Sequence, residues 1–168
     1  LMVEVLNRPA TEFGAYFALV TLVFMSGNFF GGRLSNRIGL ERMVVIGGIA
    51  AVTCAAVGLG AFAVFGLGVA VMFGTSFFIS FGNGLAMPNS QAGALNVMPE
   101  LAGTASGAAA FIQTIFGAIF AQVVASIIDP SGAALFVAML IGVSAALLFG
   151  SIPLILKIRA ARLAVGDD

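Results

Sequence analysis

The sequence is poor in the residues that a soluble protein or an enzyme needs. It has no histidine, no tryptophan, one cysteine, one tyrosine, and only seven basic and seven acidic residues among 168. Soluble domains carry roughly a quarter charged residues, whereas this chain carries 8%. The net charge is zero and there is no basic tract, so a nucleic-acid-binding function is excluded. The scarcity of charge indicates a protein whose surroundings are hydrocarbon.

The same absences exclude the usual catalytic and metal sites. Without histidine, and with no lysine before Lys157, the chain has no base to activate a serine or cysteine nucleophile. Metal sites are excluded for the same reason, because the chain has no histidine and a single cysteine to serve as ligands. Cys54 cannot form a disulfide within the chain, and we expect it to be a small buried core residue. We therefore expect no enzymatic activity, no cofactor and no metal.

Long apolar runs are what the sequence has in abundance. Charge-free runs cover residues 13–32, 43–99, 101–128 and 130–156. A bilayer core about 30 Å thick needs about 20 apolar helical residues, so three of these runs hold one span each. As a single helix the run 43–99 would be about 85 Å long. It must fold back once, and the glycine-rich stretch from Gly58 to Gly66 is the expected break.

The predicted fold is therefore all-α, a polytopic bundle of five transmembrane helices. The expected spans lie near residues 13–32, 43–60, 64–87, 101–128 and 132–156, with the longest connection at 88–100 and a tail at 157–168. Six of the seven basic residues fall in segments 33–42 and 157–168, and basic residues favour the cytoplasmic side. We expect a multi-pass protein of the cell (inner) membrane with a cytoplasmic C-terminus. Its external N-terminus then requires an earlier span upstream.

Small residues gather on one face of two expected spans. In membranes such faces let helix backbones approach closely. The predicted helix-packing face consists of Gly27 and Gly31 in the first span, and Gly103, Gly107, Ala110 and Gly117 in the fourth. The bulky residues on the other side of the fourth span are expected to face lipid.

Polar side chains form a second pattern. In the third span Met72, Ser76, Ser80, Asn83 and Met87 follow one another at intervals of three and four, which places them on one stripe of a helix. Such residues either bond to a neighbouring helix or line a transport pathway, and the pattern does not choose between the two. The candidates for the pathway are Asn28, Ser76, Ser80, Asn83 and Gln113.

The segment GGRLSNRIGLER at 31–42 resembles the cytoplasmic loop motif of the major facilitator superfamily, Gly-x-x-x-Asp-Arg-x-Gly-x-Arg-Arg. Asn36 stands where the motif has its acid, and Glu41 replaces the first of the paired basic residues. Segments 79–95 and 99–113 are similar to spans ten and eleven of the Bcr/CflA type of drug-resistance exporters in that superfamily. The residues of the loop motif are Gly32, Arg33, Asn36, Arg37, Gly39 and Arg42.

The resemblance implies that the chain is the C-terminal half of a twelve-span transporter, comprising spans eight to twelve. It implies alternating access between two halves, and proton-driven export of small lipophilic compounds. The partners would be the lipid bilayer, the missing N-terminal half, a small-molecule substrate and protons. Two other hypotheses remain open: a non-transporting structural or assembly subunit, and a half-size carrier that dimerises. Because no carboxylate lies within a span, a proton-titrating group would have to lie outside this chain.

Overall fold

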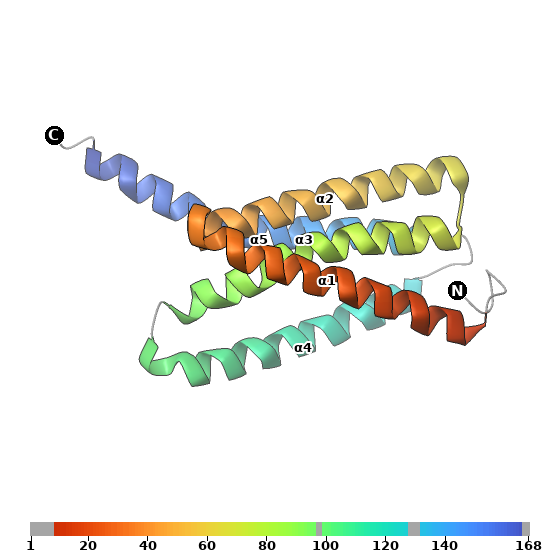
Figure 1. Ribbon diagram of the computed structural model, residues 1–168, viewed down its shortest axis with the longest axis horizontal. Coiled ribbons are helices and arrows are strands. Elements are labelled where there is room, and N and C mark those ends of the chain that lie inside the picture. The colour runs from red at the N-terminus through yellow and green to blue at the C-terminus, as the bar shows by residue number, and fades with distance from the viewer. Residues whose placement is uncertain (1–8, 97–98, 128–131, 166–168) are drawn as a thin grey trace.

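The computed structural model describes residues 9–96, 99–127 and 132–165, and the chain within these ranges is almost wholly helical (Figure 1). Its elements are α1 (Ala10–Ile38), α2 (Leu40–Phe65), α3 (Val69–Leu95), the short 3-10 helix η1 (Pro99–Leu101), α4 (Ala102–Ile127) and α5 (Ala133–Val165).

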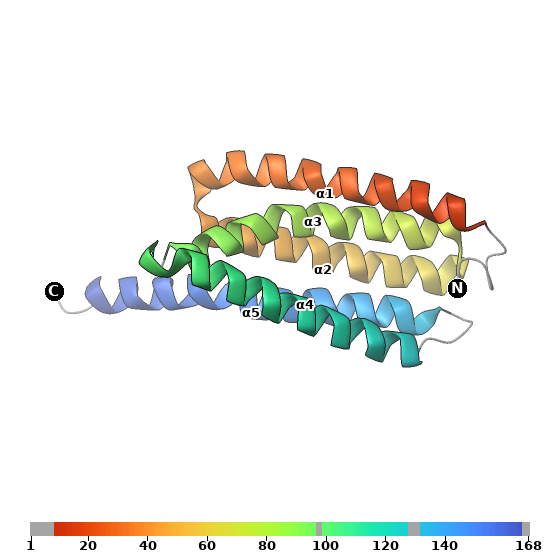
Figure 2. The ribbon, with the colours of Figure 1, turned by 90° about the horizontal axis from the view of Figure 1, so that it is seen from below.

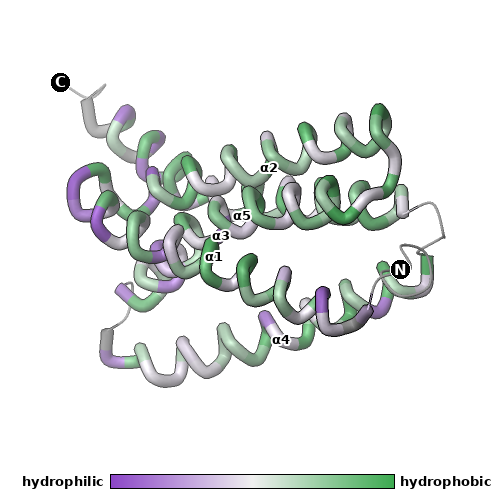
Figure 3. The backbone as a smooth tube through the Cα atoms, turned by 45° about the vertical axis from the view of Figure 1, so that its right-hand side comes forward, coloured by the Kyte–Doolittle hydropathy of each residue, from purple (hydrophilic) through white to green (hydrophobic). Residues whose placement is uncertain are grey.

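All five α-helices are long and apolar enough to cross a membrane. The shortest have 26 residues and are therefore about 39 Å long, which exceeds the bilayer core of about 30 Å. Hydrophilic residues gather at the end of the bundle where α1 turns into α2 (Figure 3). The chain is thus a multi-pass helical membrane protein, and the prediction of an all-α bundle with five spans is confirmed.

Helix α3 lies at the centre of the packing. It packs closely against α1 and α2, and α2 also packs against α5, whereas α4 makes only a few contacts, with α3, α5 and η1. In Figure 2, α1 and α4 lie on different sides of α3. None of the described residues of α4 is buried. The bundle is therefore well packed around α3 and open along α4.

Glycine pairs bring the helix backbones into contact on both sides of α3. A Cβ atom placed on Gly27 of α1 would lie 3.0 Å from the Cα of Gly84. A Cβ atom on Gly47 of α2 would lie 2.6 Å from the carbonyl oxygen of Gly82. Gly82 and Gly84 point about 160° apart around α3. The packing around α3 therefore depends on backbone approach, as is typical of membrane helices.

The break between the second and third spans lies later than predicted. Helix α2 continues through Gly58 to Phe65, and the chain turns at Gly66, whose φ is 73°. Gly58 serves packing instead, because a Cβ atom there would collide with Thr75 of α3. The third helix consequently begins at Val69, not at residue 64.

Two of the helices contain a proline. Pro88 was expected to begin the connection 88–100, yet α3 continues to Leu95. Proline removes one bond of the helix, here to the carbonyl of Gly84, and membrane helices tolerate this. Next to Pro88, the Nδ2 of Asn89 donates to a different carbonyl, that of Leu85, at 2.7 Å. Helix α5 likewise passes through Pro153, and the predicted tail 157–168 is helical as far as its described residues extend.

Candidate functional site

The polar residues of the third span lie along one flank of α3, between the sides that face α1 and α2. Met72, at the start of the stripe, is buried, and Ser76 and Ser80 are partly buried. Asn83, further along, is exposed. The hydroxyl of Ser76 donates to the carbonyl of Met72 at 2.8 Å, so its own helix satisfies it. The polar stripe thus becomes more open toward Asn83.

Asn83 lies on the side of α3 that α4 leaves open, at the depth of the membrane interior. It is about 21 Å along α3 from Val69, and Gln113 is about 17 Å along α4 from Ala102. Gln113 is also exposed, and its Nε2 is 3.9 Å from the sulfur of Met87. A thioether is a weak acceptor. Two amide side chains therefore lie near mid-membrane with little hydrogen bonding from the residues that the structure describes.

An amide in this position is costly in hydrocarbon. Unsatisfied polar groups at that depth cost several kcal/mol each, because no water replaces the missing hydrogen bond. Asn83 and Gln113 consequently need either water or another polar surface beside them. The side of α3 that carries the stripe is where such a surface would lie.

Asn28 approaches the same region of α3 from α1. Its backbone nitrogen would be 3.1 Å from a Cβ atom on Gly84. The Oδ1 of Asn28 is buried and has no hydrogen-bond partner in the part of the chain that the structure describes. Buried polar atoms are nearly always paired. This carbonyl oxygen therefore also has an unused capacity to accept a hydrogen bond.

The small-residue faces of α1 and α4 are placed differently. Gly27 and Gly31 lie against α3. On α4, by contrast, nothing in the described chain lies within 4 Å of a Cβ atom placed on Gly103, Gly107 or Gly117. Ala110 is exposed as well. In the described chain no helix packs against these glycines of the predicted packing face, and the bulky residues of α4 are exposed as well.

The segment 31–42 is mostly helical. Helix α1 runs through it to Ile38, and the turn into α2 is the single residue Gly39, whose φ of 92° favours glycine. The backbone N–H of Gly39 donates to the carbonyl of Ser35 at 2.8 Å. Gly32 lies inside α1 with open space beside it. The tight turn expected from both glycines of the motif is therefore made by Gly39 alone.

The charged residues at the turn between α1 and α2 each make a different kind of contact. The guanidinium of Arg33 lies over the ring of Phe29, 4.4 Å from its centroid. Arg37 lies in the last turn of α1, where a positive charge complements the helix dipole. Glu41 forms its ion pair outside the segment, with Lys157 of α5 at 2.9 Å.

Two more residues of the motif, Asn36 and Arg42, are exposed. Phe30, Arg33, Leu34, Asn36 and Arg37 line a shallow pocket on the last turns of α1. The pocket combines guanidinium groups with apolar side chains at the hydrophilic end of the bundle.

Sequence reasoning missed three features of these surfaces. They are the contact of Gly58 with Thr75, the approach of Gly47 to Gly82, and the pairing of Glu41 with Lys157. The glycines on both sides of Asn83 were a signal for close packing around α3. Nothing in the local pattern indicated the ion pair.

Comparison with known proteins gives one family. The sequence profile of the Major Facilitator Superfamily matches residues 1–121, which is most of the chain. No curated protein matches. No solved structure matches either.

Proposed function

Because this chain belongs to the major facilitator superfamily of membrane transporters, we propose that it forms the C-terminal half of a proton-coupled exporter of small lipophilic compounds. The observation that carries this proposal is the pair of exposed amides, Asn83 and Gln113, near mid-membrane. In the proposal they border a water-filled route between two halves of the transporter.

The chemistry of the polar stripe suits such a substrate. Small-molecule sites are mostly apolar, with a few placed polar groups that fix orientation. Ser80, Asn83 and Gln113 offer hydroxyl and amide groups without charge, and Met72 and Met87 lie among them on α3. Methionine adapts its shape to different apolar partners. A lipophilic compound with one or two polar atoms fits this combination better than a small inorganic ion or a sugar does.

Proton coupling requires an ionisable group in the part of the transporter outside this chain. Proton-driven carriers use ionisable groups inside the membrane, and the charge-free runs of this chain contain none. In the proposal, the titrating carboxylate therefore belongs to the N-terminal half. Arg33, Arg37 and Arg42 lie at the end of the bundle where α1 turns into α2, and Lys157 pairs with Glu41 there. These basic residues support a cytoplasmic location for that end, and for the C-terminus, in the inner membrane.

The open face of α4 is also compatible with two other functions. A structural subunit would bury Gly103, Gly107 and Gly117 against its partner, and a dimerising half-size carrier would bury them against a second copy. The three hypotheses differ in what completes the bundle. Reading the coding sequence upstream of Leu1 separates them: six or seven further spans with a mid-membrane carboxylate support the half-transporter, and a stop codon there contradicts it.

A transport assay tests export itself. Proteoliposomes containing this chain together with its upstream half are expected to move ethidium, a lipophilic fluorescent cation, when a pH gradient is imposed. The flux should stop when a protonophore dissipates the gradient, and the chain alone should give none. Proton-dependent flux from the chain alone would favour the dimerising carrier, and no flux from the two halves with any of a panel of lipophilic dyes would contradict the export proposal.

A further inference from the structure

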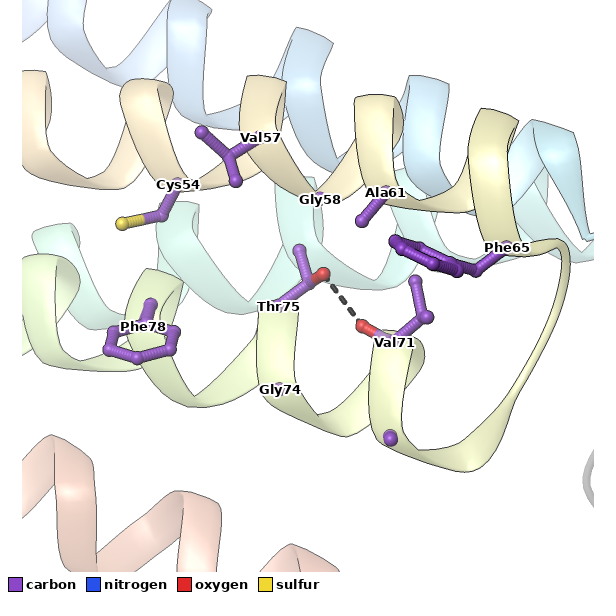
Figure 4. Close-up of a pocket in the computed structure, with 10 residues that line it drawn as sticks. Cys54, Val57, Gly58, Ala61, Phe65, Val71, Gly74, Thr75 and Phe78 are labelled. Carbon is purple, nitrogen blue, oxygen red and sulfur yellow. Dashed lines mark hydrogen bonds between the residues drawn. The ribbon is translucent and has the colours of Figure 1, made fainter.

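A second hollow surface lies on α2 and α3, away from the polar stripe. Residues 54–65 of α2 and 70–78 of α3 line a groove of about 490 Å³ (Figure 4). On α3 the groove residues Gly74 and Phe78 point about 160° away from Ser76 of the stripe. In Figure 4, α4 and α5 lie behind the groove, so that it opens away from them.

The groove exists because small side chains flank a close helix contact. Gly58 of α2 touches Thr75 of α3 at its floor. Beside this contact Ala61 and Gly74 fill little space, and nothing lies within 4 Å of a Cβ atom placed on Gly74. Phe65 and Phe78 are 80% and 66% exposed, and they form apolar walls. The result is a recess between two helices that otherwise touch.

The recess is elongated along the helices. On α2 its lining extends from Cys54 to Phe65, a distance of about 17 Å at 1.5 Å per residue. Since α2 spans the bilayer, the long axis of the groove runs across the membrane. Acyl chains of phospholipids lie in that same direction.

The lining offers no polar group that needs a partner. None of the described residues that line the groove is charged. The hydroxyl of Thr75 already donates to the carbonyl of Val71 at 2.7 Å, and the thiol of Cys54 is only a weak donor. A ligand with polar atoms at this depth would lose hydration without compensation. The lining of the groove therefore favours a ligand whose bound part is pure hydrocarbon.

We propose that this groove binds one acyl chain of a membrane phospholipid as a defined, retained lipid. Within a bilayer there is no hydrophobic gain, so binding relies on van der Waals contact between the chain and a fitting recess. Cys54, expected to be a buried core residue, is only partly buried: it packs against a core cluster on one side and lines the groove on the other. The proposal is independent of the transport hypothesis, since the groove and the polar stripe lie on different flanks of α3.

The test fills the groove with a larger side chain and measures cross-linking of a phospholipid to the protein. A phospholipid with a photoactivatable diazirine in one acyl chain is incorporated into membranes that contain the protein, and cross-linked peptides are mapped by mass spectrometry. We expect cross-links to concentrate in 54–65 and 70–78, and to fall at least fivefold in Gly74→Leu. The matched control is Gly60→Leu, because Gly60 also has open space beside it but does not line the groove; its cross-linking should not change.

Two further measurements keep the outcome decisive. Ala70→Leu, also at the groove, should reduce cross-linking in the same way if Gly74→Leu fails to fold. Native mass spectrometry in mild detergent should find one retained phospholipid on the unaltered chain and none on Gly74→Leu. Cross-links spread evenly over α2, α3 and the exposed face of α5, or a retained molecule that is not a phospholipid, would overturn the proposal.

Discussion

Gly27 of α1 and Gly84 of α3 lie in backbone contact, because a Cβ atom on Gly27 would stand 3.0 Å from the Cα of Gly84. The same atom would be 2.5 Å from the carbonyl oxygen of Phe81. This approach holds α1, and with it Asn28, against the part of α3 that carries Asn83. The glycine contact therefore connects helix packing with the geometry of the candidate pathway.

Replacing Gly27 with leucine should destabilise the chain. The added side chain meets the backbone of α3, which cannot move aside without separating the helices, and overpacking costs about 1–3 kcal/mol or more. Thermal unfolding in detergent, followed by circular dichroism, should show a lower Tm. Gly14→Leu is the matched control, because it lies on the same helix with open space beside it. Equal losses in both variants would contradict the contact.

Reversing the charge of Lys157 should weaken the attachment of α5 to α2. Glu41 and Lys157 are 2.9 Å apart, and Lys157 is 68% exposed. Exposed pairs contribute about 0.2–1 kcal/mol, so Lys157→Glu should lower the unfolding free energy by about that amount at low salt. The double variant Glu41→Lys/Lys157→Glu should restore it. Arg159→Glu serves as the control, and a double variant no better than Lys157→Glu alone would argue against the pair.

Gly107→Leu and Gly117→Leu on α4 should separate folding from assembly. Neither glycine has a neighbour within 4 Å in the described chain, so the Tm of the isolated chain should stay the same. If another helix packs on this face, leucine keeps its backbone away, and co-purification with the N-terminal half should fall at least fivefold. Phe116→Leu, on the bulky face, should leave co-purification intact. Unchanged association in the glycine variants would mean that the face is not an interface.

Asn28→Leu should leave stability intact and impair transport. The buried Oδ1 of Asn28 has no partner among the described residues, and such an atom costs about 1–3 kcal/mol. Removing it should leave the Tm unchanged or raise it slightly, while the pH-driven flux of ethidium through the assembled transporter falls several-fold. A lower Tm together with normal flux would assign Asn28 a purely structural role.

The sequence predicted the spans well where charge delimits them. The run 101–128 corresponds to α4 at Ala102–Ile127, because a charge-free segment of that length has one stable arrangement in a bilayer. The turn between α2 and α3 was misplaced, since Gly58 and Gly66 look alike in sequence. One supports close packing and the other a positive φ, and only the position of Thr75 tells them apart.

The candidate site was predictable only in part. Spacing by three and four placed Ser76, Ser80 and Asn83 on one stripe, because helix geometry alone decides that. It did not indicate that α4 would leave this side open. Nor did it indicate the pairing of Glu41 with Lys157, which are 116 positions apart in the chain. Contacts of this kind depend on how whole helices pack, and no local pattern encodes them.

The most direct test of the account asks whether water reaches Asn83 at mid-membrane. In a Cys54→Ala background, Asn83→Cys is treated in intact membranes with a charged, membrane-impermeant thiol reagent, and Phe116→Cys is the lipid-facing control, since Phe116 is 70% exposed on the bulky face of α4. A pathway lined by Asn83 predicts labelling of Asn83→Cys at least tenfold faster than that of Phe116→Cys. If both cysteines react only with a lipid-soluble maleimide, Asn83 does not face a water-filled route, and the proposed pathway is wrong.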